Sequence, residues 1–279
     1  MRKRDQVMLC YPYEEKRFLK WGNAIIQPKL DGDRCLAKLD KGQVKLYSST
    51  GIEITSVPHI NKELQELLSD VTALKLDLEL DGELYLHGMK HPEISGLVRT
   101  KWGAPEEAKR LQYHIFDIPT LNETYKDRIS TLSQMPLGEA VKRLPTDFAG
   151  TINDVSLLLK EYMKQGYEGF VLKDPNSKYE RKRSTNWMKY KPKTCDSYLI
   201  IGTVEEYSIH NEPKNQLGAL ILTDETQQFK VGTGFTQQQR KELWKIKEQL
   251  PGKAWCTITY QELSKDGIPR EPVFVEINV

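Results

Sequence analysis

Alternation of hydrophobic and polar residues predicts several β-strands in the first part of the chain. Three of them follow one another, and Asp40-Lys41-Gly42 has the composition of a hairpin turn between the second and the third. Further along, Leu alternates with Lys, Asp and Glu, which is typical of a half-buried strand. The predicted strands are Ala24–Leu30, Arg34–Leu39, Gln43–Ser48, Leu74–Leu80, Tyr113–Ile118 and Glu168–Lys173.

Two segments of this first part have helical spacing instead. Behind Pro58, the residues Ile60, Leu64 and Leu67 recur every three or four positions, which predicts a helix over Pro58–Ser69. A second helix starts at about Asp154 and should stop at Gly166, because glycine adopts the left-handed C-cap conformation at little cost.

The pattern changes after Pro192, and we place a domain boundary near residues 192 to 196. Five short strands are predicted there, with one helix, Thr236–Leu250, between the third and the fourth; Thr236 should cap its start, and Pro251-Gly252 should stop it. This is the element order of an OB-fold barrel. The strands are Ser197–Glu206, Leu217–Thr223, Gln227–Gly232, Ala254–Glu262 and Pro272–Val279.

Length and composition indicate a folded protein of two domains or of one large domain. The chain has 279 residues, of which 38% are hydrophobic and 29% charged, so disorder throughout is excluded. No stretch reaches the roughly 20 apolar residues of a membrane-spanning helix, and the start is too short for a secretory signal, so we expect a cytoplasmic protein. The four cysteines are too far apart for a zinc ribbon or a redox pair, which favours reduced thiols.

Charge is unevenly distributed along the chain. The net charge of +2 says little about partners, but Lys178–Lys193 holds seven basic residues and one acid. A basic run is usually a solvated surface; here it could also neutralise the phosphates of a nucleic acid.

The segment from Gln27 to Arg34 is the most informative one. A lysine at a strand end, Lys29, is followed by Leu30, Asp31, Gly32, Asp33 and Arg34. A surface turn built on Asp31-Gly32 is one interpretation, and a ligand site is the other.

This segment matches the KxDGxR signature of the covalent nucleotidyltransferases, which include ATP-dependent DNA ligases, RNA ligases and mRNA capping enzymes. Other segments resemble further motifs of this superfamily in the family's order. Two C-terminal segments resemble the OB domain of small viral and bacteriophage DNA ligases, so the chain resembles a minimal ATP-dependent DNA ligase from Gln27 to Val275. These segments are Ser48–Gly51, Leu80–Tyr85, Tyr113–Asp117, Glu168–Lys173 and Trp187–Pro192, followed by Val231–Phe235 and Pro269–Phe274.

The resemblance implies an α+β fold. A nucleotidyltransferase (ATP-grasp-like ligase) domain with antiparallel sheets, residues 1–193, would precede a β-barrel OB-fold domain, residues 194–279. It also implies ATP as cofactor with Mg²⁺, or Mn²⁺ in its place, and nicked double-stranded DNA as partner of a monomer.

The resemblance assigns Lys29 as the nucleophile that forms a phosphoramidate with AMP. A lysine amine attacks phosphorus only when it is unprotonated, and nearby cations favour that form. Arg34, Lys189, Lys191 and a bound metal could serve. Lys189 and Lys191 are two residues apart, which predicts that they share one face of a strand, with Met188 and Tyr190 on the other.

The resemblance also implies the remaining site residues. Alone, Glu83 and Glu168 would be exposed acids at strand ends, Asp31 a turn residue, and Phe116 a core residue. In the family's pattern Phe116 stacks on adenine, and carboxylates hold a hard cation through oxygen. The implied sets are Gln27, Pro28, Leu30, Arg34, Glu83, Phe116, Lys189 and Lys191 for the nucleotide, Glu83, Glu168 and Asp31 for metal, Arg34, Ser48, Lys182 and Arg183 for DNA, and Arg270 for orienting pyrophosphate.

The chain departs from the family's pattern in a few places. Ser49 stands where the family usually has an arginine, so one contact to the nick is in doubt. The loop Ser208–Gln216 is too short for a full DNA-encircling latch, and the 26 residues before Gln27 leave no room for an N-terminal DNA-binding domain. An RNA ligase, a capping enzyme and a non-catalytic nucleic-acid-binding relative are the alternatives.

Overall fold

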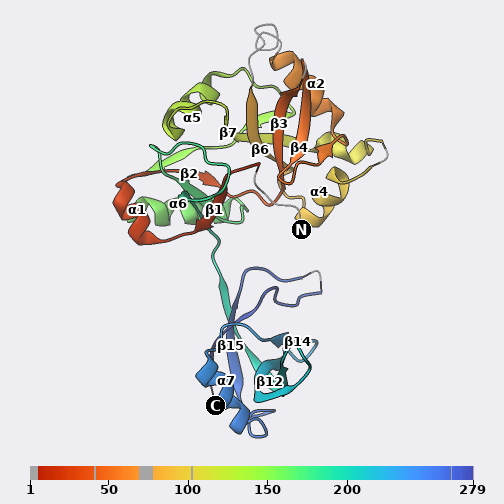
Figure 1. The fold of residues 1–279 in the computed structure, drawn as a ribbon, viewed down its shortest axis with the longest axis vertical. Helices are drawn as coiled ribbons and strands as arrows, with labels where there is room; N and C mark the ends of the chain where they lie inside the picture. Colours follow the sequence, from red (N-terminus) through yellow and green to blue (C-terminus); the bar gives the residue numbers. More distant parts are fainter. Residues whose placement is uncertain (1–5, 41, 69–77, 102, 265, 279) are drawn as a thin grey trace. The chain divides into compact units, whose positions relative to one another are not determined.

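The computed structural model describes residues 6–40, 42–68, 78–101, 103–264 and 266–278. The chain divides into two compact units, Met1–Tyr190 and Lys191–Val279 (Figure 1). Each unit has its own hydrophobic core, and each is described by itself below.

The larger unit contains a five-stranded sheet covered by two helices. Its strand pairs are antiparallel except for the parallel pair of β1 and β11. The helices α1 (Glu15–Trp21) and α6 (Ile152–Lys164) pack on it through Phe18, Val155 and Tyr162 (Figure 1). In spatial order the strands are β1 (Leu9–Pro12), β11 (Arg183–Tyr190), β10 (Phe170–Lys173), β2 (Ala24–Pro28) and β9 (Asp147–Ala149).

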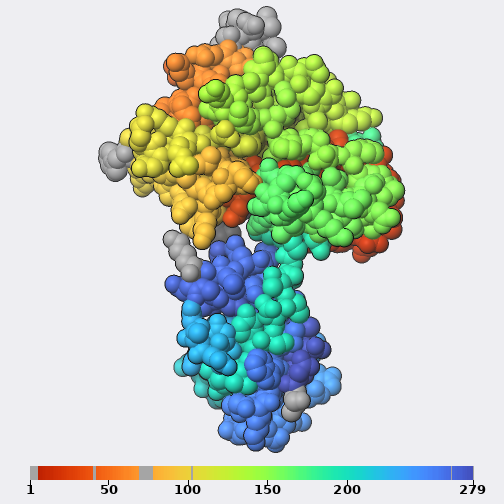
Figure 2. All heavy atoms as spheres, turned by 180° about the vertical axis from the view of Figure 1, so that it is seen from behind, coloured from red at the N-terminus to blue at the C-terminus, as the bar shows by residue number. Residues whose placement is uncertain are grey.

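A six-stranded sheet forms the rest of this unit. The helices α2 (Pro58–Leu67), α4 (His91–Val98) and α5 (Tyr125–Gln134) and the 3-10 helix η1 (Glu106–Arg110) surround it and bury its core. Residues of α5 and α6 gather on one side of the unit and those of α2 and α4 on the other (Figure 2). In spatial order the strands are β5 (Glu53–Ile54), β4 (Gln43–Ser48), β3 (Asp33–Asp40), β6 (Glu79–Tyr85), β7 (Gln112–Asp117) and β8 (Val141–Arg143).

The pattern of the sequence predicted most of these elements. The strand Gln43–Ser48 and the start of α2 at Pro58 are confirmed, and Gly166 has the left-handed φ of +86° expected beyond α6. Helix α6 begins two residues before Asp154, because the Thr151 hydroxyl accepts from the Asp154 N–H and caps the helix there.

One predicted strand is shifted. Of Leu74–Leu80, residues 74–77 lie outside the described residues, and β6 continues beyond Leu80 to Tyr85. Gly82 allows β6 to lie close to β7, since a Cβ at this position would lie 2.5 Å from the His114 carbonyl oxygen.

The smaller unit has the predicted order of three strands, a helix and two strands. Its helix α7 (Gln237–Lys245) is capped by Thr236, as predicted, through a capping box with Gln239. The strands, in spatial order, are β14 (Gln228–Val231), β13 (Pro213–Thr223), β12 (Thr194–Tyr207), β15 (Trp255–Tyr260) and β16 (Val273–Asn278).

Two expectations for this unit were wrong. The strands form one antiparallel sheet in which no ladder between β14 and β16 closes a barrel. The two ends of the sheet meet at an isolated bridge between Thr233 and Val273, where the Phe274 N–H donates to the Thr233 carbonyl at 3.0 Å. Helix α7 ends at Lys245 and not at Leu250. It buries no residue of its own, and the turns that follow bring Leu250 into the core.

Two further findings concern the chain as a whole. The described helices include none whose length and apolar character would suit a bilayer crossing. All four cysteines are free thiols, with Cys35 and Cys256 buried.

Candidate active site

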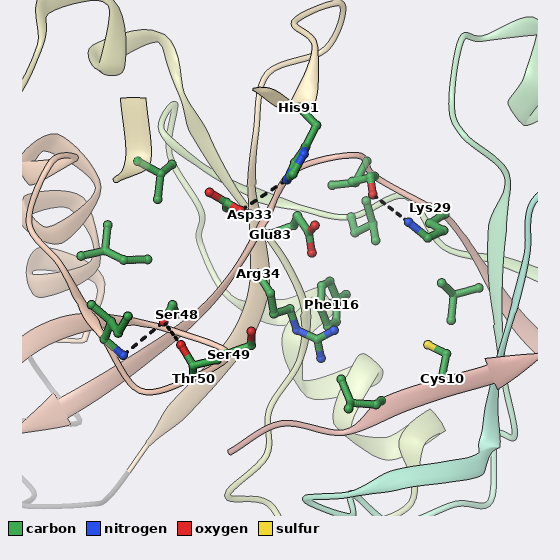
Figure 3. A pocket seen from close by; sticks show the side chains of 18 of the residues that line it. Cys10, Lys29, Asp33, Arg34, Ser48, Ser49, Thr50, Glu83, His91 and Phe116 are labelled. Carbon is green, nitrogen blue, oxygen red and sulfur yellow. Dashed lines mark hydrogen bonds and ion pairs between the residues drawn. The ribbon is translucent and has the colours of Figure 1, made fainter. Parts of the chain in front are cut away.

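A cavity of about 860 Å³ lies in the larger unit, and residues from both of its sheets line it. Lys29 and Cys10 lie on one side of Arg34, and Ser48, Ser49 and Thr50 lie on the other (Figure 3). The sequence-predicted residues around the cavity are Gln27, Pro28, Lys29, Leu30, Arg34, Ser48, Glu83, Phe116, Arg183 and Lys189.

Lys29 is placed by the pairing of β2 with β10. Pro28, at the end of β2, lies opposite Phe170, and the Lys29 N–H donates to the Gly169 carbonyl at 2.9 Å. This register brings Lys29 next to Glu168, and the Lys29 Nζ forms an ion pair with the Glu168 carboxylate. Both side chains are mostly buried, so the pair is shielded from water.

The turn after Lys29 requires glycine. A Cβ on Gly32 would lie 2.3 Å from the Leu84 carbonyl oxygen, so only glycine lets the turn lie this close to β6.

Asp31 in the same turn lies outside the cavity lining, near Tyr85. Burial raises the pKa of Tyr85 to about 12, and the charges of Tyr167 and Asp31 contribute.

Arg34 is fixed by a buried carboxylate. Its Nε and Nη2 donate to the two oxygens of Asp81, both at 2.6 Å, and Nη2 also reaches the Met8 carbonyl at 3.3 Å. Burial works to lower the pKa of Arg34, but attraction and hydrogen bonding to Asp81 outweigh it and raise the pKa. The Tyr179 hydroxyl also donates to Asp81, at 2.5 Å. The guanidinium therefore has a defined position, 4.5 Å from the centre of the Phe116 ring.

Glu83 lies opposite Arg34 in the register of β3 and β6. Burial raises the pKa of Glu83 to about 7, although Arg34 and Lys29 work to lower it. The cations already present therefore compensate this carboxylate only in part, and a further cation at the site would stabilise its charged form.

Phe116 is buried at the cavity wall and surrounded by polar and aromatic groups. Lys173 Nζ lies 4.4 Å from the Phe116 ring centre and 4.0 Å from that of Trp187. It also donates to the Tyr125 hydroxyl at 3.0 Å. Burial lowers the pKa of Lys173 to about 7. The Tyr125 hydroxyl donates in turn to Gln27, which is buried.

Of the basic residues in Lys178–Lys193, some line the cavity and others lie outside it. Arg183 lines the cavity and donates to the Cys10 carbonyl, whereas Lys182 pairs with Glu180 at 2.8 Å and is not part of the lining. In the smaller unit, Arg270 forms an ion pair with Glu262 at 2.6 Å.

The prediction that Lys189 and Lys191 share one strand face is wrong. Strand β11 ends at Tyr190, so only Lys189 is in it, and Lys191 belongs to the smaller unit. Met188 and Tyr190 do pack in the core under α1 and α6, as their alternation with Lys189 predicted. The proline at position 192 explains the early end, because proline has no N–H for a ladder.

The residues of the site that the sequence analysis missed include Lys173, Asp81 and Trp187. All three lie within segments that resemble the family's motifs. The sequence of those segments does not show which side chains are buried or with which partners they pair. An acid two residues before Glu83 on a strand was the available signal for Asp81, since alternate strand residues share a face.

Two models of known protein families match this chain. A family model described as ATP dependent DNA ligase domain matches residues 7–191. The chain belongs to this family. A second model, DNA ligase OB-like domain, matches residues 211–277. Both predicted resemblances are thereby confirmed.

Individual relatives agree with the family. The DNA ligase of Enterobacteria phage T4 is 24% identical over 276 residues, which cover 81% of this chain and 56% of that protein. The DNA ligase of African swine fever virus is 28% identical over 291 residues, covering 90% and 64%. The chain thus spans less than two thirds of the length of these relatives. A solved structure named Pmar-Lig_PreS3 has a TM-score of 0.76 and 25% identity, covering 98% of this chain and 67% of that one.

Proposed function

We propose that this protein is an ATP-dependent DNA ligase, which seals nicks in duplex DNA through a covalent lysyl-AMP intermediate. The observation that carries the proposal is the amine of Lys29 at a cavity lined by Arg34, Glu83, Phe116 and Lys189, in a chain of the ligase family.

In the first step, Lys29 Nζ attacks the α-phosphorus of ATP, a bond forms between nitrogen and phosphorus, and pyrophosphate leaves. The amine must give up a proton before it can attack, and Glu168 is the carboxylate placed to accept it. Lys189 at the cavity would stabilise the charge that grows on the α-phosphate.

The nucleoside would lie against the buried wall of the cavity. Adenine stacks on Phe116, with Gln27, Pro28 and Leu30 around it, and Arg34 and Glu83 bind the ribose side. Because Asp81 holds the guanidinium of Arg34, little side-chain freedom is lost when the nucleotide binds. Lys191 and Arg270, from the smaller unit, are proposed for the phosphates and for pyrophosphate orientation.

Among the described residues no three potential metal-ligating side chains form a cluster, so the magnesium site is proposed around Glu83. Glu83 is a carboxylate that existing cations compensate incompletely, Glu168 lies beside Lys29, and Asp31 is in the adjoining turn. These oxygens would hold Mg²⁺, or Mn²⁺ in its place, because hard cations prefer oxygen ligands. The ion would supply positive charge that offsets the phosphates.

Two further steps would complete sealing. AMP passes from Lys29 to the 5′-phosphate at the nick, and the 3′-hydroxyl then attacks that phosphate and releases AMP. Arg34, Ser48, Lys182 and Arg183 are proposed to contact the DNA. We assign the adenylation domain to residues 1–193 and the OB-fold domain to residues 194–279, in a cytoplasmic protein that acts as a monomer.

The test begins with the protein incubated with α-labelled ATP and Mg²⁺ and analysed on a denaturing gel. Wild type should carry label and Lys29→Met should carry none, while Lys16→Met, a matched change at an exposed lysine on α1, should behave as wild type. Label retained on Lys29→Met would overturn the proposal. Sealing of nicked DNA but not nicked RNA, and label from ATP but not from GTP, would separate it from the RNA-ligase and capping alternatives.

A further inference from the structure

Gln27 lies in the wall of the cavity, and both ends of its side-chain amide already have a partner. The residue is 1% exposed. Its Nε2 donates to the Thr146 hydroxyl at 2.9 Å, and the Tyr125 hydroxyl donates to its Oε1 at 2.9 Å. Each amide atom can make one more hydrogen bond, since Nε2 carries two hydrogens and Oε1 has two lone pairs. Whether a bound base meets a donor or an acceptor therefore depends on which way round the amide is held.

The Thr146 hydroxyl fixes one end of this amide. Its hydrogen is donated to the Leu144 carbonyl at 3.0 Å, so its oxygen accepts from Gln27. A reversed amide would place Oε1 against the Thr146 oxygen. The hydroxyl would then have to leave the Leu144 carbonyl in order to donate to Gln27, and that hydrogen bond would be lost.

The Tyr125 hydroxyl fixes the other end. Lys173 Nζ donates to its oxygen at 3.0 Å. The single hydrogen of the hydroxyl then faces two carbonyl acceptors, Gln27 Oε1 and the Phe116 main-chain oxygen at 3.0 Å. A reversed amide would bring a second donor to an oxygen that already accepts from Lys173. Because Tyr125 is 0% exposed, water does not compete for this hydroxyl.

Oε1 is the amide atom on the side where the base is proposed to stack. The Tyr125 hydroxyl contacts both Oε1 and the main chain of Phe116, the residue proposed to carry the adenine. Nε2 points instead to Thr146, which is exposed and lies outside the cavity lining. The free lone pair of Oε1 is therefore the group of Gln27 that a base at Phe116 would meet.

Purine bases differ at position 6 in a way that a held amide can distinguish. Adenine has an amino group there, which is a donor, whereas guanine and hypoxanthine have a carbonyl oxygen, which is an acceptor. An oxygen fixed in place accepts from the amino group but makes no hydrogen bond with a carbonyl. A glutamine that could reverse would suit both kinds of base, because its nitrogen can donate. Selection of adenine therefore requires that the amide be held in one orientation.

We propose that Tyr125 and Thr146 are positioning residues for the choice of nucleotide: they hold Gln27 so that Oε1 accepts from the 6-amino group of adenine, and bases with a 6-carbonyl are rejected. Both lie outside the cavity lining, so they act through Gln27. This inference rests on the proposed function, because it concerns the nucleotide that Lys29 attacks.

The test compares three nucleotides as sources of the label. Tyr125→Phe keeps the ring and removes the hydroxyl, and Thr146→Val keeps the shape of an exposed residue. For each protein, kcat/KM for formation of the covalent adduct is measured with α-labelled ATP, inosine triphosphate and purine riboside triphosphate. The base of inosine has a 6-carbonyl and, like adenine, no 2-amino group, and purine carries only hydrogen at position 6.

Two matched variants serve as controls. Tyr113→Phe removes a buried hydroxyl that donates to the Leu80 carbonyl at 2.6 Å, outside the cavity lining. Thr120→Val removes an exposed hydroxyl that accepts from the Glu79 N–H at 3.2 Å. Either control can lose stability, but neither should change the preference of the protein for ATP over inosine triphosphate.

Wild type should prefer ATP to inosine triphosphate. In Tyr125→Phe and in Thr146→Val the ratio of the two kcat/KM values should fall by about 3- to 10-fold, which is the range of a single hydrogen bond. The double variant should fall further. Purine riboside triphosphate should be used by the variants nearly as well as by wild type, because it has no group at position 6 for Gln27 to bind.

Two results would overturn the inference. An equal fall for all three nucleotides would show a purely structural role, and a ratio as constant as in the controls would show that the two hydroxyls do not govern base choice. Should Tyr125→Phe not fold, Thr146→Val decides alone.

A failure of the proposed function would look different. Wild type would then form no adduct with any of the three nucleotides. Calorimetric titration with the same nucleotides would still test the positioning: wild type must bind ATP more tightly than inosine triphosphate, and Thr146→Val must reduce that difference. Equal affinities in wild type would overturn the inference.

Discussion

The two units of this protein differ in what they bury. In the larger unit, Asp81, Asp117, Arg128 and Lys173 are buried, at most 2% exposed. In the described part of the smaller unit, the buried polar residues are Gln216 and Thr257, and no charged residue is buried. Its core consists of side chains such as Leu220, Val231 and Ile258.

This difference shows where the protein gives up stability in order to fix the positions of side chains. Burying a charge is costly even when it is paired, and an apolar core of the same volume is often at least as stable. Two of the four buried charges either line the cavity or hold a residue that does: Lys173 lines it and Asp81 fixes Arg34. Asp117, which pairs with Arg128, also attracts the Lys173 ammonium. The buried charges therefore mark the part of the molecule in which side-chain orientation matters most.

The largest expected effect comes from breaking the pair of Asp117 and Arg128. Arg128 donates to both oxygens of Asp117, at 2.6 and 3.0 Å, and to the Glu123 carbonyl at 2.7 Å. Arg128→Met should lower the free energy of unfolding of the larger unit by about 3–5 kcal/mol, because it leaves the Asp117 charge buried without a partner. Hydrogen exchange of peptides from α5 and β7 would measure the change, and unaltered exchange there would contradict it.

A second effect is a pH dependence that originates at Lys173. Its pKa is lowered to about 7 in the folded protein, whereas an unfolded lysine titrates near 10.4. Between these values the unfolded state binds more protons, so stability should rise with pH, by up to about 1.4 kcal/mol per pH unit.

Lys173→Met should remove this rise. The measurement is urea unfolding at pH 7, 8 and 9 for wild type and variant, with Lys142→Met, a change at a partly exposed lysine on β8, as the control. Equal slopes in wild type and Lys173→Met would show that the ammonium is not the source.

A smaller effect is expected at Tyr179, which donates to Asp81 and accepts from the Met8 N–H at 3.0 Å. Tyr179→Phe should cost about 1–3 kcal/mol, because a buried charge loses one hydrogen bond. If the role of Tyr179 is to position Arg34 through Asp81, KM for ATP should rise more than kcat falls. A stability loss without any change in KM would indicate a purely structural role.

The smallest effect on stability is expected in the smaller unit. The ion pair of Arg270 with Glu262 is exposed, so Arg270→Ala should cost less than about 1 kcal/mol in urea unfolding. Under the proposed function the same variant should slow adenylation. If Arg270→Ala lowered the free energy of unfolding strongly and left adenylation unchanged, the contrast between the two units would be contradicted.

Local sequence determined much of the secondary structure. The strand at Gln43–Ser48, the stop of α6 before Gly166 and the Thr236 cap depend on side-chain alternation, on a left-handed glycine and on a hydroxyl near free N–H groups. Each of these signals acts within a few residues, so it can be read from the chain itself. The residues Lys29, Arg34 and Glu83 were predicted from the resemblance to the family's motifs, and all three line the cavity.

Tertiary structure decided the rest, because the partners are far apart in the sequence. The pairing of Lys29 with Glu168 depends on the register of β2 and β10, and the burial of Lys173 depends on aromatic rings from three other elements. Helix α7 ends early, at Lys245, and the turns that follow it place Leu250 in the core. Sequence supplied the groups for chemistry, and the long-range strand pairing determined which of them meet.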